Sequence, residues 1–205
     1  MTVPEEIISR YEKVAVATVY SALSLFDYGP CFMKGVKAFT PGSNLVGPAK
    51  TLRFIPPRKD IQAETRKGEN SPEYIAMGSC NPGDVLVVDG LGKKYAAIAG
   101  DVKLTHLKMR TAAGLVTDGS IRDLDIVKSY GFAIFAGGRT PTGGDPEIDP
   151  FEPNVPIQCG GVAVVPGDLI VGDDDGIVVV PETLIEEVID WVEEHEAVEE
   201  WIKVR

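Results

Sequence analysis

The sequence predicts an α/β protein with a parallel βαβαβ core, flanking short strands and terminal helices. Three observations support this fold class. Aliphatic runs alternate with amphipathic segments through the middle of the chain, as in strand–helix–strand units whose sheet is covered on both faces. Glycine and proline bound these runs and mark turns between them. Apolar residues also recur at helical spacing near both termini.

The first elements are expected to be N-terminal helices over about residues 3–28. Thr2 and Glu5 have the spacing of a capping box, and Pro4 suits the first turn of a helix. The stretch "VATVYSALSLF" continues as a second helix. Further on, "AKTLRFI" is expected to form a strand.

Helices and strands are expected to alternate through the central part of the chain. Residues 57–70 are polar and predict a loop or an irregular helix, and "SPEYIAMGSC" predicts a short helix. The strands are "DVLVVDG", "LVTDG", which breaks at Gly119, and "FAIFAGG". A helix beginning at "DVKLTHLK" is expected to end at Gly114, and a second one, "IRDLDIVKSYG", at Gly131.

Short strands with glycine and proline turns are expected after Pro150, followed by a C-terminal helical extension over about residues 182–205. That helix has an apolar stripe within an acidic surface, formed by Leu184, Val188, Trp191 and Val192. Its end is expected to project from the body.

Composition limits the classes of function. The chain has 205 residues, 44% of them hydrophobic, which suits a single domain over residues 1–205 with a sizeable core. The net charge of -11 argues against a nucleic-acid partner, because no basic stripe is available to neutralise phosphates. The sequence also has no basic run suited to an anionic membrane. Neither nucleic acid nor a membrane is therefore expected as a partner.

The cellular setting is expected to be reducing and cytoplasmic. Three cysteines lie far apart, at Cys31, Cys80 and Cys159, and are interpreted as reduced, partly buried thiols. The first residues, "MTVPEEIISRYEKV", have no basic segment followed by an apolar one, so no secretory signal is expected. No apolar run reaches the length that spans a bilayer.

Two loops are expected to form a ligand crevice at the carboxyl ends of neighbouring parallel strands. One is Gly100-Asp101 and the other is "DGSIRD", which contains Arg122 and Asp123. Free amides in the first turn of a helix, at residues 102–104, can hold a carboxylate. Arginine can grip a carboxylate with two donors, and aspartate can hold Mg²⁺ or orient a water.

A plainer interpretation of the same residues stays open at this point. Asp123 can be an ordinary acid in a helical first turn, with Arg122 as its surface partner, and spacing does not decide between the two interpretations. Other candidates are weaker. His106 and His195 lack metal-ligand spacing. Arg139 follows Gly137-Gly138 at the end of a strand and could reach the crevice, but it is interpreted as a loop arginine. The acidic "GDDDG" at residues 172–176 is interpreted as a solvated turn between strands.

On these residues the sequence resembles the family that contains the regulator of ribonuclease E activity A (RraA) and the 4-hydroxy-4-methyl-2-oxoglutarate (4-carboxy-4-hydroxy-2-oxoadipate) aldolases. The resemblance rests on Asp101, then twenty residues, then Arg122-Asp123 and Asp125. Supporting similarity runs through "PGDVLVVDG", "GFAIFAGGRTP" and "CGGVAVVPGDLIVGDDDGIVVVP". It covers roughly the last two-thirds of the chain.

The resemblance implies a swivelling β/β/α fold and a homo-oligomer, a ring-shaped trimer or a dimer of trimers. It also implies a class II aldolase in which Asp123 anchors Mg²⁺ or Mn²⁺ and Arg122 binds a small 2-oxo acid and steadies the pyruvate enolate. The amides after Gly100 would hold the substrate carboxylate, and the residues concerned are Gly100, Asp101, Val102, Lys103 and Leu104.

The resemblance further implies a water, positioned by Asp101 and a glutamate of a neighbouring subunit, that takes the proton of the substrate's C4 hydroxyl. We select Glu196 for that role from the C-terminal glutamates, which are Glu193, Glu194, Glu196, Glu199 and Glu200.

Two functions follow from the resemblance. The first is a divalent-metal-dependent lyase that makes pyruvate from a 4-hydroxy-2-oxo di- or tricarboxylic acid, with oxaloacetate decarboxylase side activity. The second is a non-catalytic protein that binds and regulates a ribonuclease of the E type. Asp123 directly after the arginine and the long acidic C-terminal helix favour the enzyme.

Overall fold

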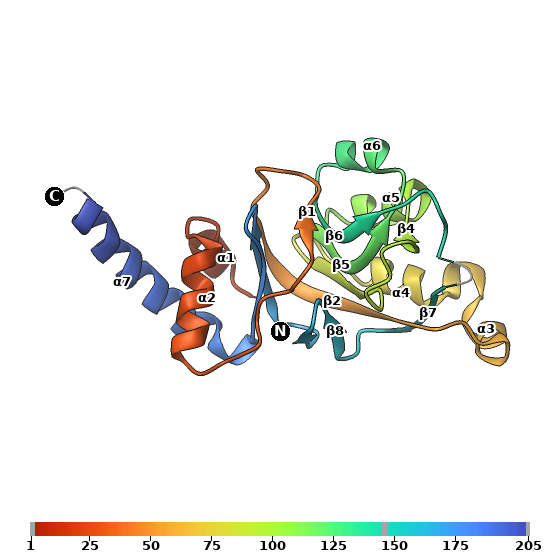
Figure 1. Cartoon of the computed structure of the whole chain (residues 1–205), viewed down its shortest axis with the longest axis horizontal. Helices are drawn as coiled ribbons and strands as arrows, with labels where there is room; N and C mark the ends of the chain where they lie inside the picture. Colours follow the sequence, from red (N-terminus) through yellow and green to blue (C-terminus); the bar gives the residue numbers. More distant parts are fainter. Residues whose placement is uncertain (1–2, 145–146, 204–205) are drawn as a thin grey trace.

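A mixed sheet of nine strands forms the body of the protein in its computed structural model, which describes residues 3–144 and 147–203 (Figure 1). The strand order is β1-β6-β5-β3-β2-β10-β11, with β4 paired to β5 and β7 to β2. A two-stranded hairpin, β8-β9, forms a separate small sheet that packs against it. In chain order the elements are α1 (Glu5–Tyr11), α2 (Val16–Leu25), β1 (Lys37–Ala38), β2 (Leu45–Ile55), α3 (Lys59–Thr65), η1 (Gly68–Asn70), α4 (Pro72–Gly78), β3 (Val85–Asp89), β4 (Ala97–Ala99), α5 (Asp101–Met109), β5 (Gly114–Ile121), α6 (Leu124–Val127), η2 (Lys128–Tyr130), β6 (Ala133–Arg139), β7 (Asp149–Pro153), β8 (Ile157–Cys159), β9 (Val162–Val164), β10 (Leu169–Asp173), β11 (Gly176–Val180), η3 (Glu182–Leu184) and α7 (Ile185–Lys203).

The predicted parallel core is confirmed. Strand β3 runs parallel to both β2 and β5, and β5 runs parallel to β6 and β4. Every residue of β3 and β5 is buried, as expected of parallel strands that are covered on both faces. Helix α4 connects β2 to β3, α5 connects β4 to β5, and α6 connects β5 to β6.

The sheet closes almost into a barrel through the segment from residue 31 to residue 38, which we call the closing segment. Its first part pairs with β11, because Val179 donates its amide to Cys31 O at 2.9 Å and Met33 donates to Ile177 O at 3.0 Å. Its last part is β1, which pairs antiparallel with β6. The closing segment therefore joins the two opposite edges of the sheet.

Three apolar clusters fill the structure. The first lies between the sheet and helices α4, α5 and α6, and the second fills the inside of the curved sheet beneath the β8-β9 hairpin. The third joins α1, α2 and the first half of α7 to β10 and β11. The terminal helices thus cover one end of the body, and α4 to α6 cover the other (Figure 1).

Several predicted boundaries were wrong. Helix α5 ends at Met109, before Gly114, because Thr111 at a φ of 53° turns the chain into β5. Gly114 instead opens β5, where an added Cβ would lie 2.5 Å from a side-chain atom of Leu45. Strand β5 does not break at Gly119 but runs to Ile121, because β4 pairs with its last residues.

Other predicted elements were confirmed, with more order than expected in one of them. The polar segment 57–70 forms α3 and η1, and the helix after Asp123 ends at Gly131 in a left-handed conformation. The acidic loop 172–176 is the turn of the β10-β11 hairpin. The capping-box prediction falls on Thr2, which lies outside the described residues, and Pro4 precedes the first turn.

Helix α7 has two different halves. Its first half is packed in the core, with Ile185, Val188, Ile189 and Val192 buried. Tyr11 Oη donates a hydrogen bond to Ile185 O at 2.8 Å and fixes the start of the helix. The second half projects away from the body, as predicted (Figure 1).

Candidate active site

The two predicted loops lie side by side because β4 and β5 are paired neighbours. Ala99 is in register with Ile121, so Gly100 and Arg122 follow directly at the carboxyl ends of adjacent strands. Arg122 donates its backbone amide to Ala99 O at 3.1 Å, which extends the pairing into the loops. The structure therefore brings the two predicted loops together, with Arg122 bordering a hollow on either side.

Asp123 is not an ordinary acid of a helical first turn. Its backbone is left-handed, at φ 56° and ψ 33°, and its side chain makes no capping bond to α6. The carboxylate turns back instead, and its Oδ2 accepts the Asp101 amide at 3.3 Å and lies 3.3 Å from Arg122 Nε. The backbone and the direction of the carboxylate thus differ from those of an ordinary first-turn acid, while the Arg122–Asp123 ion pair that the plainer interpretation expects is present.

Gly100 allows this close approach. Its φ of -143° is ordinary extended backbone, so the requirement is for space and not for conformation. An added Cβ would lie 2.4 Å from Asp123 Oδ2 and 2.7 Å from Arg122 Cγ, both shorter than any normal contact. A residue larger than glycine would displace both charged side chains.

The amides of the first turn of α5 are partly engaged within the protein. Val102 donates its amide to Asp101 Oδ1 at 2.7 Å, and Leu104 donates to Gly100 O at 2.9 Å. Asp101 therefore folds its carboxylate onto its own helix. A ligand carboxylate that binds the Val102 amide has to replace the Asp101 side chain there, which then turns toward the crevice.

Arg122 separates two hollows in the surface. The first has a volume of about 490 Å³ and is lined by residues 121–126 together with Arg139, Thr140 and Pro141. Arg139 is the last residue of β6 and lines the same hollow as Asp123, so of its two interpretations the one that reaches the crevice agrees with the structure. The second hollow, about 370 Å³, lies on the α5 side, and its lining includes Gly100, Lys103 and Arg122.

A third hollow continues the second one away from Arg122. It has a volume of about 430 Å³ and shares part of its lining with the second, namely Tyr74, Ala97, Ile98, Lys103, Gly143 and Gly144. We call these two hollows together the distal cleft. Its lining includes Arg66 and Gly68 from the polar segment 57–70, and Asp149 and Pro150 from β7.

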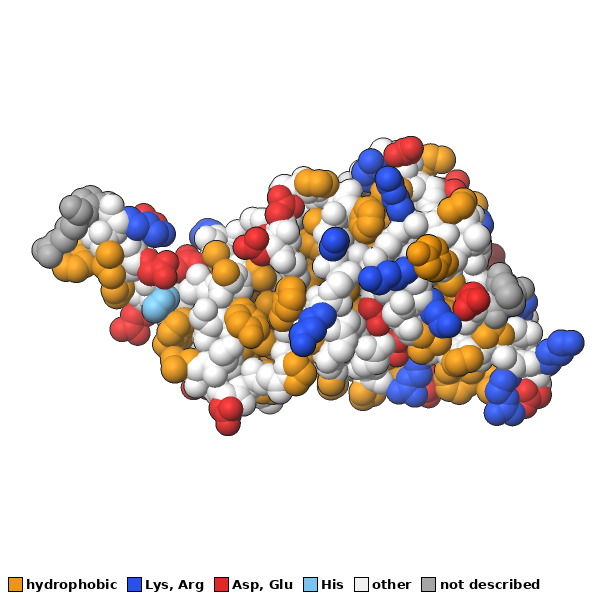
Figure 2. All heavy atoms as spheres, in the orientation of Figure 1, with side chains coloured by type: hydrophobic (Ala, Val, Ile, Leu, Met, Phe, Trp, Pro, Cys, Tyr) orange, Lys and Arg blue, Asp and Glu red, His pale blue; other side chains and the backbone are white. Residues whose placement is uncertain are grey.

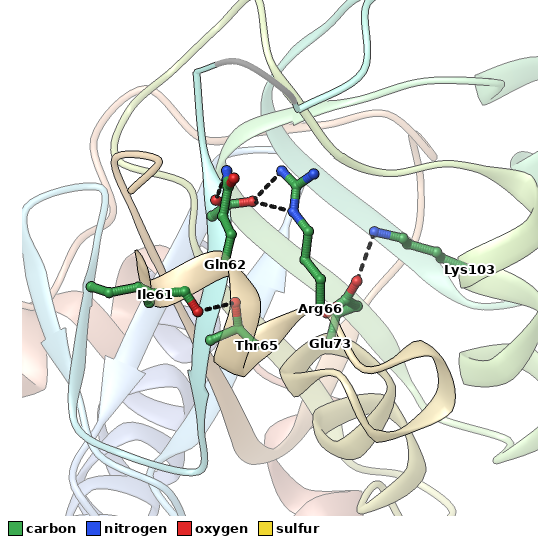
Figure 3. A network of polar contacts seen from close by, with 7 residues as sticks. Ile61, Gln62, Thr65, Arg66, Glu73 and Lys103 are labelled. Carbon is green, nitrogen blue, oxygen red and sulfur yellow. Dashed lines mark hydrogen bonds and ion pairs between the residues drawn. The ribbon is translucent and has the colours of Figure 1, made fainter. Parts of the chain in front are cut away.

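The distal cleft contains polar residues that sequence reasoning missed (Figure 3). Arg66 donates to Asp149 Oδ1 at 2.8 Å, and Gln62 donates to the other oxygen of the same carboxylate. Lys103 Nζ lies 3.1 Å from Glu73 Oε1. No sequence signal pointed to Gln62, Arg66, Glu73 and Asp149, because α3, α4 and β7 meet only in the folded chain. Lys103 was expected to contribute its backbone amide, and its side chain contacts Glu73 instead.

Glu196 is not near Asp101 in a single chain. Its Oε1 accepts the Ala15 amide at 3.0 Å, at the start of α2. Helix α7 lies at the end of the molecule opposite α5 and α6 (Figure 1). The role selected for Glu196 therefore requires a second copy of the chain and stays a prediction.

The remaining candidates have structural partners. The His106 ring meets Tyr74 edge-on at 4.9 Å between centroids, and the His195 ring stacks on Trp191 at 4.5 Å.

All three cysteines are buried and free, as predicted. Burial raises the pKa of the Cys80 thiol to about 12, which suppresses its reactivity.

The donor set around Asp123 fits a hydrated magnesium or manganese ion. Such ions take oxygen ligands and are often held by one or two carboxylates, with waters and substrate completing the shell. Asp123 is partly exposed to the hollow that it lines, and its Oδ1 has no hydrogen-bond partner among the described residues. Within the same residues, no group of three or more acidic, histidine or cysteine side chains is placed to enclose a metal.

One global feature concerns membranes. Across residues 3–144 and 147–203, no helix combines the length and the apolar character that crossing a bilayer requires.

Sequence comparisons relate the chain to known proteins. Residues 16–179 match the family described as RraA-like, Aldolase/RraA. A protein of Halalkalibacterium halodurans named "Putative 4-hydroxy-4-methyl-2-oxoglutarate aldolase" is 38% identical over 165 residues, which are 80% of this chain and 73% of that protein.

Solved structures of the same family also resemble this chain. The chain is 33% identical to Streptomyces coelicolor RraAS2, described as an unusual member of the RNase ES inhibitor RraA protein family, with a TM-score of 0.91 over 100% of this chain and 99% of that one. The RNA-processing inhibitor RraA from Thermus thermophilis is 23% identical, with a TM-score of 0.59 over 80% of this chain and 92% of that one, and shares the fold. The chain therefore belongs to the RraA-like family, which contains both a protein named as an aldolase and proteins named as RNA-processing inhibitors.

Proposed function

We propose that the protein is a divalent-metal-dependent aldolase. It cleaves a 4-hydroxy-2-oxo di- or tricarboxylic acid to release pyruvate, and it decarboxylates oxaloacetate as a side activity. The observation that carries the proposal is the position of Asp123. Its left-handed backbone turns the carboxylate to the Asp101 amide and to Arg122 Nε, across from a glycine that leaves room for all three.

Substrate binding uses Arg122 and the start of α5. The guanidinium of Arg122 is about half exposed and borders both hollows, so it can donate to the carboxylate and the oxo group of a 2-oxo acid. The amides after Gly100 point from the positive end of α5 and stabilise the same carboxylate. Both interactions orient the bond to be broken toward Asp123.

Cleavage leaves negative charge on the oxo group as the pyruvate enolate forms. Arg122 stabilises that charge because its donors are already aimed at the oxygen before reaction. When bound at Asp123, Mg²⁺ or Mn²⁺ supplies a Lewis acid for the same oxygen. The Asp101 carboxylate, released from the Val102 amide, orients a water that takes the proton of the C4 hydroxyl.

We also propose that the working form is a homo-oligomer, a trimer or a dimer of trimers. Helix α7 projects from the body and carries exposed apolar side chains, visible at its tip in Figure 2. Such a surface suits packing against another copy of the chain. In that assembly Glu196 of one subunit would reach the Asp101 crevice of the next.

The first test is pyruvate release with the full-length protein. Oxaloacetate and 4-hydroxy-4-methyl-2-oxoglutarate are supplied separately with Mg²⁺, and EDTA is added later. Asp123→Asn keeps a side chain that tolerates the left-handed backbone while removing the charge, so we expect at least a hundredfold loss of kcat/KM with an unchanged circular dichroism spectrum. Arg122→Lys is expected to lose about as much, because an ammonium has no bidentate grip.

The same assay distinguishes the aldolase from a second candidate function. The full-length likeness to a member of the RNase ES inhibitor RraA family favours a non-catalytic regulator that binds a ribonuclease. Absence of EDTA-sensitive pyruvate release above the buffer rate from either substrate would reject the aldolase and leave the regulator.

A further inference from the structure

One segment of the chain holds both polar groups of the Asp101 backbone. This segment runs from Asp123 to Tyr130 and contains α6 and η2. At its start, the Asp123 carboxylate accepts the Asp101 amide at 3.3 Å. At its end, Tyr130 Oη donates to Asp101 O, also at 3.3 Å. The peptide groups on both sides of Asp101 are therefore fixed by the same crossover between β5 and β6.

The Tyr130 side chain lies along α5. Its ring packs against the apolar cluster between the sheet and this helix, and Lys108 Nζ lies 4.8 Å from the ring centroid. Thr105 Oγ1 is 3.3 Å from Tyr130 Oη and donates to Asp101 O at 2.9 Å. Two hydroxyl groups thus converge on one backbone oxygen. The Thr105 bond lies within its own helix, so it is the Tyr130 bond that ties this oxygen to another segment.

The oxygen that Tyr130 contacts belongs to the same planar peptide group as the Val102 amide. That amide already holds a carboxylate, because it donates to Asp101 Oδ1 at 2.7 Å. A hydrogen bond to the carbonyl oxygen withdraws electron density from the nitrogen of the same peptide group and makes its N–H a stronger donor. Tyr130 therefore strengthens the amide that is proposed to receive the substrate carboxylate, and it also fixes the direction of that N–H.

This restraint matters when the Asp101 side chain moves. In the proposed function, the Asp101 carboxylate leaves the Val102 amide and the substrate carboxylate takes its place. The backbone has to stay where it is during this exchange, so that rotation of the side chain alone moves the carboxylate. The contacts from Tyr130 and Asp123 are made to the backbone and persist through the exchange.

We propose that Tyr130 is a positioning residue of the active site, which orients and polarises the Val102 amide by donating a hydrogen bond to Asp101 O. The inference rests on the proposed function, because that function places the substrate carboxylate on this amide. At 3.3 Å the bond is longer than the ~2.5–3.0 Å usual for an O–H···O contact. Its removal is therefore expected to cost less than the removal of a catalytic residue.

The test measures ligand binding without turnover. Pyruvate carries both the carboxylate and the oxo group, and it is titrated by calorimetry into the full-length protein with Mg²⁺. Tyr130→Phe keeps the ring beside Phe132 and Lys108 but lacks the hydroxyl. The dissociation constant for pyruvate is expected to rise about fivefold, as for the loss of one ordinary hydrogen bond. In the cleavage assay KM rises by a similar factor and kcat changes less, because the carboxylate stays bound throughout the reaction.

A second readout reports on the peptide group directly. Loss of a hydrogen bond from a carbonyl oxygen moves the ¹⁵N signal of the following amide upfield. In protein labelled with ¹⁵N-valine, the Val102 signal is assigned as the one that disappears in Val102→Ile. In Tyr130→Phe this signal is expected to move upfield, because Asp101 O has lost a donor.

Tyr11→Phe is the matched control, because Tyr11 Oη also donates to a backbone carbonyl, that of Ile185, at the other end of the molecule (Figure 1). It is expected to lower Tm without changing the dissociation constant for pyruvate. An unchanged dissociation constant in Tyr130→Phe would overturn the inference, since a purely structural tyrosine would lower Tm alone. An equal rise in both variants, a Val102 signal that stays in place, or no binding of pyruvate by the wild type would also overturn it.

Turnover is scored separately from binding. A wild type that binds pyruvate, loses affinity in Tyr130→Phe and yet cleaves neither substrate rejects only the aldolase. The positioning role of Tyr130 then remains supported for the binding of a 2-oxo acid.

Discussion

Gly100 and Asp123 are each suited to their position for a different physical reason. Asp123 accepts a left-handed backbone, which aspartate and asparagine adopt more readily than most other residues. Gly100 has an ordinary extended backbone but no room for a side chain. The active-site geometry therefore depends on one conformational requirement and one steric requirement, placed on adjacent strands.

Gly100→Ala is expected to lower kcat/KM about a hundredfold, because the new methyl group displaces Asp123 and Arg122 from their reacting positions. Gly143→Ala is the matched control. It adds a methyl group to the same cleft at 3.9 Å from Arg122 Nη1, an ordinary contact distance. Steady-state kinetics of both variants check this prediction. Equal kcat/KM values in the two variants would show that the close approach of Gly100 to Asp123 and Arg122 is unimportant.

Asp89, the last residue of β3, and Asp118, in the middle of β5, form a buried acidic pair. Gln158 donates to both carboxylates, at 2.6 Å to Asp89 and 2.9 Å to Asp118, and so fastens the β8-β9 hairpin onto the sheet. Burial is the main cause that raises the pKa of Asp89, and the nearby Asp118 charge adds to it. The folded protein therefore binds this proton more tightly than the unfolded chain does.

Asp89→Asn is expected to stabilise the protein at neutral pH and to change little near pH 4. A raised carboxyl pKa in the folded state means that the stabilisation from this group is lost as pH rises through that pKa, and the neutral amide avoids the loss. The amide oxygen still accepts the Leu91 amide and Gln158. Thermal unfolding from pH 4 to pH 8 checks the prediction, with about 2–4 °C in Tm for each kcal/mol gained. A Tm difference that shrinks as pH rises would contradict it.

At the scale of elements, α7 combines a core helix with a projecting one. Its first half packs on α2 and β11, whereas its second half exposes Val198, Trp201 and Ile202. Arg10 on α1 bonds Glu193 at 2.6 Å near the boundary, which lowers the pKa of the Glu193 carboxyl. Deleting everything after Pro181 would therefore remove buried residues and unfold the domain before it tested assembly.

Val198→Ser with Ile202→Ser is the sharper test of assembly. The two side chains are 52% and 61% exposed, so the fold of one chain is expected to survive their replacement. If they pack on a second copy, each contributes about 1 kcal/mol or more to association, and the assembly weakens by over tenfold. Val165→Ser, at a residue 48% exposed on the body, is the matched control. If sedimentation gives the same oligomeric state for both variants, the exposed end of α7 does not lie in the interface.

At the scale of the whole molecule, the sequence predicts those features that depend on residues close together in the chain. The parallel core was predictable because its strands are short aliphatic runs bounded by glycine, and Asp101 with Arg122-Asp123 followed from the right-handed crossover between adjacent strands. The distal cleft was not predictable. Glu73 looks like any acid in a first helical turn, and it becomes buried only when α4 packs against β7, α5 and β2.

The closing segment also determines when the chain can finish folding. Its residues are made early, yet their hydrogen-bond partners Ile177 and Val179 belong to the last strand to be synthesised. Until the ribosome has released β11, the nascent protein holds an open sheet with unpaired strand edges, the kind of surface that recruits other chains. Such distant pairing is also slow to form. The near-closure of the sheet is therefore among the last contacts that the chain can form during synthesis.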